Sequence, residues 1–336
     1  SVLVKDEPDY LDDYYGFIRK YRRMVGHLDT ESDPDSLGMA MEPGYCVVPV
    51  SDDNRGDDKD KKEHLIGYVA YYNRAILSSG KKVPLVLCFH GGGDSAVAMV
   101  SLAEWHRVAH EHDFLLVSVE HHMNSTATEA VALLAHLKDT YMIDEERVYA
   151  TGFSMGGCKS WDLFQEYPSL FAAVAPMDAT FPVGTNVYAE RVEKINRDTV
   201  VPVFYVGGED SPLPELPFQE QKCLDRMKYV MEVNRSRRKP EFSFEEQSLW
   251  PNPIQCIDGD VVCKAKDDLT GSVLTMHLYE SENGCCYCVF GSASKQMHEM
   301  RHLNCENAWK FMRNFRRLAN GEIEGGRFDD IVKVYC

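Results

Sequence analysis

Short apolar runs recur along the middle of the chain, and the spacing between them is the feature that most limits the possible fold. The runs that we expect to be strands lie at about 65–72, 84–89, 114–119, 147–151, 171–176 and 201–206. Residues 126–141 have the spacing of a helix, opened by a capping box from Thr126 to Glu129. Parallel strands need crossovers of a dozen residues or more. The sequence therefore predicts an α/β fold, with a mostly parallel sheet and helices on both faces.

The chain shows no linker that would divide this pattern. We expect residues 1–64 to form an N-terminal extension packed on the core, with a surface helix at about 6–26 and an exposed charged loop at 51–63. Residues 65–336 then form one α/β domain. Within it, residues 234–271 lack a helical period and are interpreted as a loop or cap placed before the last strand. A last amphipathic helix is expected around 308–315.

The charge balance limits the possible partners. The 336 residues include 36 Lys and Arg against 53 Asp and Glu, a net charge of −17. Such a chain repels phosphate backbones and anionic membrane surfaces, and no stretch approaches the roughly 20 apolar residues of a membrane helix. Neither nucleic acid nor a membrane is expected as a partner, and the oligomeric state is left open.

The cysteines leave the compartment open. There are 11, and a chain with a large core does not need disulfides, so free thiols in a reducing cytoplasm are the simplest interpretation. Secretion is also possible, because a signal peptide could have been removed before Ser1. Cys285, Cys286 and Cys288 lie too close together for two zinc-binding pairs and are interpreted as strand residues.

A nucleophile motif stands between an expected strand and an expected helix. Gly152-Phe153-Ser154-Met155-Gly156 reads G-x-S-x-G. In that context the serine sits on a sharp turn and its hydroxyl projects above the sheet. The Met155 N–H then points into the same space, where the helix dipole favours negative charge. An ordinary turn between strand and helix is the less specific alternative.

A second glycine-rich turn, His90-Gly91-Gly92-Gly93, follows an earlier strand. Consecutive glycines let backbone N–H groups approach a substrate oxygen, so Gly92, Gly93 and Met155 are the candidate oxyanion hole. His90 is interpreted as structural. No phosphate-binding glycine pattern is present.

The serine needs a base, and His277, His298 and His302 lie far enough downstream. His277 lies in an alternating strand-like run and is expected to be structural. His298 lies in the loop before the last helix and is preferred as the base, with His302 as the alternative.

The base in turn needs an orienting acid. Asp210 is preferred because it follows the strand expected at 201–206. Glu209 and then Glu215 are the alternatives.

Five segments together resemble the α/β-hydrolase superfamily, in particular the polyhydroxybutyrate depolymerase and feruloyl esterase group. They are PLVLCFHGGG, RVYATGFSMGG, YPSLFAAVAP, GGEDSPLP and MHEMRHLNCENAWKFMRNFRR, and the resemblance covers roughly residues 65–318. It implies a carboxylesterase-type serine hydrolase that needs no cofactor, with Ser154, Asp210 and His298 as the triad. Its substrate would be a small or polymer-linked ester. Met297 departs from the family, which has a glycine before the histidine.

Three other functions remain open at this stage. A serine peptidase of the prolyl-oligopeptidase type would use the same triad. His298-Glu299-x-x-His302 also spells a zinc-binding pattern, with Glu322 as a possible third ligand, provided that the segment is helical. A non-catalytic binding protein with the same fold is the third, because fold does not fix function.

Overall fold

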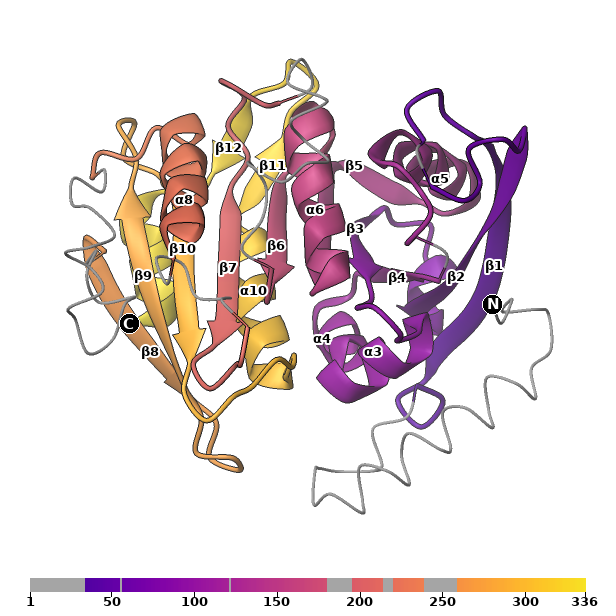
Figure 1. Cartoon of the computed structure of the whole chain (residues 1–336). Coiled ribbons are helices and arrows are strands. Elements are labelled where there is room, and N and C mark those ends of the chain that lie inside the picture. The colour runs from indigo at the N-terminus through magenta and orange to yellow at the C-terminus, as the bar shows by residue number, and fades with distance from the viewer. Residues whose placement is uncertain (1–33, 55, 121, 180–194, 214–219, 239–258) are drawn as a thin grey trace.

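The structure is a computed structural model that describes residues 34–336 except 55, 121, 180–194, 214–219 and 239–258. The helix expected at 6–26 and the candidate acid Glu215 lie outside these residues. Figure 1 shows one large twisted sheet that runs through the molecule. None of the helices in the described ranges combines the length and the apolar character that a membrane span requires.

The main sheet has ten strands in the order β1-β2-β4-β3-β5-β6-β7-β10-β9-β8. Their bounds are Met39–Pro49 (β1), Glu63–Asn73 (β2), Val83–Phe89 (β3), Leu115–Val119 (β4), Ile143–Phe153 (β5), Ala173–Met177 (β6), Val203–Gly208 (β7), Val261–Lys266 (β8), Val273–Glu280 (β9) and Cys286–Ala293 (β10). The six strands from β4 to β10 are parallel, and the pairs at both edges are antiparallel. The mostly parallel sheet predicted from the sequence is confirmed.

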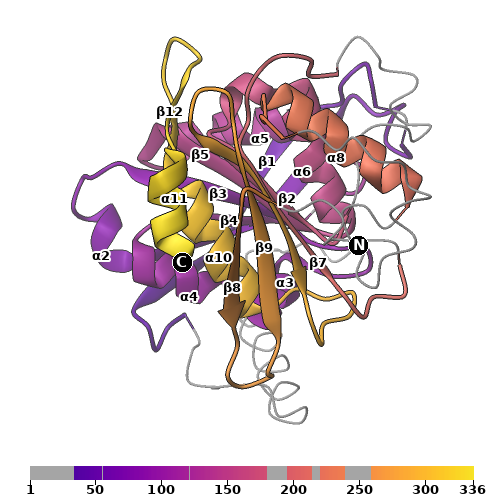
Figure 2. The ribbon, with the colours of Figure 1, turned by 90° about the vertical axis from the view of Figure 1, so that its left-hand side faces the viewer.

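Helices cover both faces of this sheet, as the turned view in Figure 2 shows. One face packs against α3 (Ala96–Ala103), α4 (Trp105–His112), α10 (His302–Met312) and α11 (Phe328–Tyr335), and the other against α5 (Ala127–Thr140), α6 (Met155–Glu166) and α8 (Gln221–Val233). The short elements are α2 (Arg74–Leu77), a 3-10 turn at Pro168–Leu170, and the hairpin of β11 (Phe315–Arg317) and β12 (Ile323–Gly325).

Neighbouring strand residues belong to opposite cores, which explains the continuous apolar runs. Val86 and Phe204 pack on the α3 and α10 side, whereas Leu87 and Tyr205 pack on the α5 and α6 side. Successive side chains of a strand point to opposite faces. A central strand that is covered on both faces is therefore apolar at nearly every position.

Two segments differ from their expected form. Residues 39–49, expected in an extension, form β1 and pair with β2 along 11 residues of the same sheet. In the segment 234–271, expected to be a loop or cap, residues 261–266 form the edge strand β8. Both strands are half-exposed edges, where polar and charged residues interrupt the apolar pattern that makes central strands readable.

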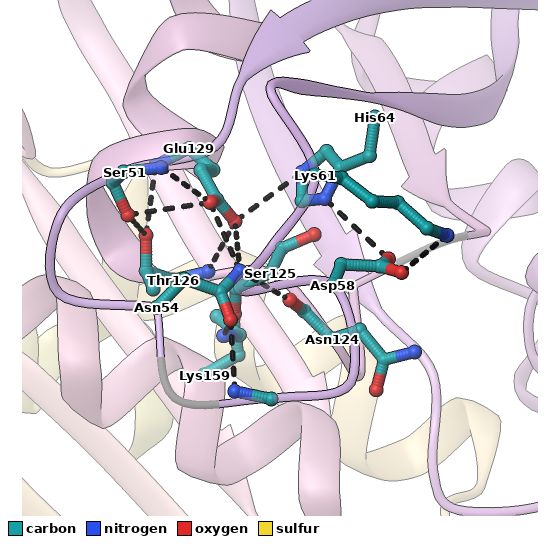
Figure 3. Close-up of polar contacts among 11 residues, drawn as sticks. Ser51, Asn54, Asp58, Lys61, His64, Asn124, Ser125, Thr126, Glu129 and Lys159 are labelled. Atoms are coloured by element: carbon teal, nitrogen blue, oxygen red, sulfur yellow. Dashed lines mark hydrogen bonds and ion pairs between the residues drawn. The ribbon is translucent and has the colours of Figure 1, made fainter.

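The charged loop at 51–63 is anchored rather than merely exposed. Glu129 is fully buried and forms the predicted capping box with Thr126 at the start of α5. Its carboxylate also accepts hydrogen bonds from Ser51 N at 2.8 Å and Asn54 Nδ2 at 3.1 Å, and lies 3.3 Å from His64 Nε2 (Figure 3). One buried carboxylate thus joins the loop, β2 and α5.

A disulfide joins Cys263 on β8 to Cys336, directly after α11. The free-thiol interpretation is therefore wrong for these two cysteines. Cys286 and Cys288 are buried residues of β10, as the strand interpretation predicts.

Candidate active site

Ser154 stands on a sharp turn between β5 and α6, as the motif predicts. Its backbone has φ 55° and ψ −115°, a conformation that side chains with a Cβ rarely adopt. A Cβ on Gly152 would lie 2.1 Å from Gly156 O, and one on Gly156 would lie 1.9 Å from Phe89 O. A side chain at either glycine of the motif would therefore collide with backbone atoms. The absence of a side chain at Gly156 lets the start of α6 pack against the end of β3.

The structure brings Ser154 and His298 together across 144 residues of sequence. His298 Nε2 lies 2.9 Å from Ser154 Oγ, which is hydrogen-bonding distance. The His298 ring packs beside Phe153, with 4.8 Å between ring centroids. Burial lowers the pKa of His298 below its ordinary value of 6.5. A neutral imidazole in this position can take the serine proton.

The glycine-rich turn after β3 lies against the serine turn. The Cβ that Gly92 lacks would lie 3.5 Å from Met155 Cγ, and Gly93 has φ 74°. His90 is buried, and its ring contacts backbone oxygens rather than Ser154. Gly92, Gly93 and Met155 thus adjoin one another at the carboxyl ends of β3 and β5.

The loops that carry the candidate acid and the base are hydrogen-bonded to each other. Glu209 N donates to Ala293 O and Asp210 N to Gln296 O, each at 2.9 Å. A Cβ on Gly208 would lie 2.1 Å from Met297 O, so only glycine lets the histidine loop pass so close to β7.

The two candidate acids differ in their contacts. Glu209 accepts a hydrogen bond from Ser292 Oγ at 2.8 Å. Asp210 is exposed, and its backbone N donates to Gln296 O in the loop before His298. The contacts therefore do not select the acid, and Asp210 stays a prediction from its place after β7.

Met297 stands where the polyhydroxybutyrate depolymerase and feruloyl esterase group has a glycine before the histidine. Its side chain is 57% exposed. Because the side chain points to solvent, the residue before His298 does not need to be glycine here.

Asp178 is a buried carboxyl to which the sequence analysis assigned no role. It follows β6, has φ 51°, and accepts a hydrogen bond from Gly208 N at 3.1 Å. Its Oδ2 is buried and has no partner among the described residues. Burial raises the pKa of this carboxyl well above its usual range. Through its bonds to Gly208 N and Val206 O, Asp178 joins the end of β6 to β7; its place directly after an apolar strand was the signal in the sequence.

The zinc pattern does not have the geometry it needs. His298 lies in a loop, whereas His302 is the first residue of α10. The two histidines are therefore not one turn apart on a single helix. Across the described parts of the chain, no group of three or more His, Cys, Asp or Glu residues could hold a metal ion.

A pocket of about 420 Å³ opens beside His298, between α3 and the loop that precedes α10. Apolar side chains line it from α3, from the serine turn and from the start of α10, namely Met99, Leu102, Phe153, Met300 and Leu303. Charged side chains of both signs, including Asp94, Arg107, Asp267 and Arg301, line the rest. The pocket offers space for part of a substrate next to His298.

The positions of these residues in the sheet decide the fold. In the parallel block from β4 to β10, Ser154 follows the middle strand β5 and His298 follows β10, with antiparallel β1 and β2 at one edge. The chain has the α/β-hydrolase fold. No model of a known protein family matches it.

The proteins to which this chain is similar include esterases. A bifunctional acetylxylan esterase/xylanase of Neocallimastix patriciarum is 30% identical over 134 residues, which is 37% of this chain and 19% of the relative. The chain thus spans about a fifth of that relative's length.

Among solved structures, a thermostable esterase is 21% identical, with a TM-score of 0.42, 59% of this chain covered and 52% of the other. Ferulic acid esterase from Streptomyces cinnamoneus is 14% identical, with a TM-score of 0.43, 58% of this chain covered and 71% of the other.

Proposed function

We propose that the chain is a serine hydrolase of carboxylic esters that works through an acyl-enzyme. The observation that carries the proposal is the 2.9 Å contact between Ser154 Oγ and His298 Nε2, on a strained turn at the N-terminus of α6. A nucleophile in contact with a neutral base is the arrangement that acyl transfer requires. The similarity to part of a bifunctional acetylxylan esterase/xylanase supports esters over other acyl compounds.

The reaction follows in two steps from these residues. His298 takes the proton of Ser154 as its Oγ attacks the ester carbonyl, and the oxygen that becomes negative is held by N–H groups of Gly92, Gly93 and Met155. His298 then gives the proton to the leaving alcohol. Water, activated by the same imidazole, attacks the acyl-enzyme and releases the acid.

Asp210 is proposed as the acid that orients His298. Its loop is hydrogen-bonded to the loop of His298, which supports this role. Glu209 is already bonded to Ser292. Asp210→Asn should lower kcat by orders of magnitude, while Glu209→Gln should change it little. The reverse result would assign the role to Glu209.

The test of the function is a substrate panel on wild type and Ser154→Ala. The panel contains p-nitrophenyl esters, feruloyl esters, acetylated xylan and proline-containing anilides. We expect ester hydrolysis by wild type, covalent labelling by a fluorophosphonate, and loss of both in Ser154→Ala. Ser169→Ala, which removes an exposed serine after α6, is the matched control and should keep full activity. Ester hydrolysis retained by Ser154→Ala would refute the assignment, and turnover of the anilides alone would indicate a peptidase.

We further propose that the domain functions in an oxidising compartment. The disulfide between Cys263 and Cys336 supports this, because cytosolic thiols are kept reduced. Mass spectrometry of the native protein, alkylated without reduction, should find these two cysteines joined. Alkylation of both would contradict the proposal.

A further inference from the structure

The oxyanion loop is defined here as residues 90–93. The mechanism above uses neither the ring of its first residue, His90, nor that of His122, which packs against it. His90 is 4% exposed and His122 is 1% exposed. Their rings meet edge to face, with 4.6 Å between centroids. His122 comes from the loop after β4, so the contact joins two loops at the carboxyl end of the sheet.

Among the described residues, the ring nitrogens of this pair contact backbone carbonyls of the loops. His122 Nε2 donates to His90 O at 2.7 Å. His90 Nδ1 lies 2.7 Å from Gly91 O, and His90 Nε2 lies 2.8 Å from Glu120 O. Carbonyl oxygens only accept, so the contact with His90 O requires that His122 Nε2 carries hydrogen.

The protonation of His122 is determined by its surroundings. Its Nε2 must carry hydrogen to bond His90 O, and its Nδ1 has no hydrogen-bond partner within the described ranges. Burial lowers the pKa of His122 well below 6.5, and the nearby His90 and Lys159 act in the same direction. His122 is therefore a neutral imidazole with a single donor, and that donor is directed at the first carbonyl of the oxyanion loop.

Fixing a carbonyl fixes the N–H on the other side of the same peptide bond, because the peptide unit is planar. His90 O shares a peptide unit with Gly91 N–H, and Gly91 O shares one with Gly92 N–H. The bond from His122 thus orients the first unit. In the second unit, Gly91 O lies 2.7 Å from His90 Nδ1 and accepts a hydrogen bond from Asp94 N at 3.2 Å. Glycine imposes little preference on φ and ψ, so these contacts restrict the orientation of the Gly92 N–H.

The loop that carries His122 is itself held from below. Asn54 Nδ2 donates to Asn124 O at 3.0 Å, and Lys159 Nζ of α6 donates to Ser125 O (Figure 3). The backbone that carries His122 is therefore held in place, so its ring can orient the oxyanion loop.

We propose that His122 is a positioning residue for the oxyanion hole, acting through His90 to aim the Gly92 N–H at the developing negative charge. The proposal rests on the proposed function of the site. Because the oxyanion forms only during reaction, His122 should affect kcat and leave KM nearly unchanged.

The central experiment is His122→Phe, which keeps a ring of similar size and removes the donor. We expect kcat per active site to fall about 10- to 100-fold, as misplacement or loss of one oxyanion donor does, with KM within about twofold. Active sites are counted by the burst of p-nitrophenol, so that misfolded protein does not count as slow enzyme. His277→Phe, at a buried histidine of β9 that also bonds a backbone group, is the matched control and should keep its kcat.

A second measurement separates positioning from general damage. A boronic acid that forms a tetrahedral adduct on Ser154 places an oxygen in the oxyanion hole, so its affinity for His122→Phe should fall by the same factor as kcat/KM. His122→Gln carries an amide N–H that can replace the donor, and it should recover most of the lost rate. If His122→Phe does not fold, His122→Met, which also lacks a donor, is compared with His122→Gln in the same way.

Three results would overturn the proposal. They are a kcat per active site in His122→Phe within twofold of wild type, a boronate affinity that does not change, or equal losses in the variants with and without a donor. Failure of the proposed function is distinct, since it would appear as ester hydrolysis that survives in Ser154→Ala.

Discussion

Replacing Glu129 should release the loop at 51–63 at a cost that the contacts allow us to work out. Glu129→Leu leaves two backbone donors without their acceptor, Ser51 N and Thr126 N. Asn54 Nδ2 keeps Asn124 O at 3.0 Å, and Ser51 Oγ keeps a partner because it also lies 2.7 Å from Thr126 Oγ1. At about 1 to 1.5 kcal/mol for each unsatisfied donor, the free energy of unfolding should fall by about 2 to 3 kcal/mol. Glu129→Gln keeps one acceptor oxygen and should cost about half as much.

Urea unfolding followed by tryptophan fluorescence measures this loss, and limited proteolysis measures opening of the loop. Cleavage within 51–63 should become faster in Glu129→Leu than in wild type. Glu145→Gln is the matched control, since Glu145 forms an ion pair with Lys138 on the surface, and it should cost under about 0.5 kcal/mol. A loss below about 1 kcal/mol in Glu129→Leu, with an unchanged m-value, would refute the reasoning.

Two further predictions concern the base and the disulfide. The base must be neutral and burial lowers the pKa of His298, so kcat/KM should rise with pH through a midpoint below 6.5; a midpoint at or above 6.5 would contradict this. Cys336→Ser opens a covalent loop between positions 73 residues apart, so the free energy of unfolding should fall by up to about 4 kcal/mol; a urea midpoint equal to that of wild type would show that the disulfide does not stabilise the fold.

The central sheet was readable from the sequence because its strands are buried on both faces. Their apolar runs, such as 84–89 and 201–206, are continuous, and the structure places strands within one or two residues of these bounds. The edge strands β1 and β8 were missed because one face of each meets water, and residues such as Glu42 and Lys264 interrupt the pattern. These segments are strands because they pair with neighbouring strands, and the local sequence does not indicate that pairing.

The site was readable where chemistry requires a local motif. Ser154 and its glycines follow one another in sequence, and steric limits at Gly152 and Gly156 explain why. The place of His298 depended on which loop meets Ser154, and the sequence alone left His302 open. Asp178 and His122 were not assigned roles, because their partners are backbone groups of distant segments that carry no residue signature.

The contact between Ser154 and His298 also means that enzyme activity can be used to follow folding of the chain. The serine follows β5 and the histidine follows β10, and β6 and β7 lie between them in the sheet. Locally formed helices and hairpins cannot produce this contact; it requires the long-range alignment of β10 with β7, which is the slow kind of event in folding. During renaturation, turnover should therefore return later than the early circular dichroism change that comes from locally formed helices, and no earlier than the pairing of β10 with β7.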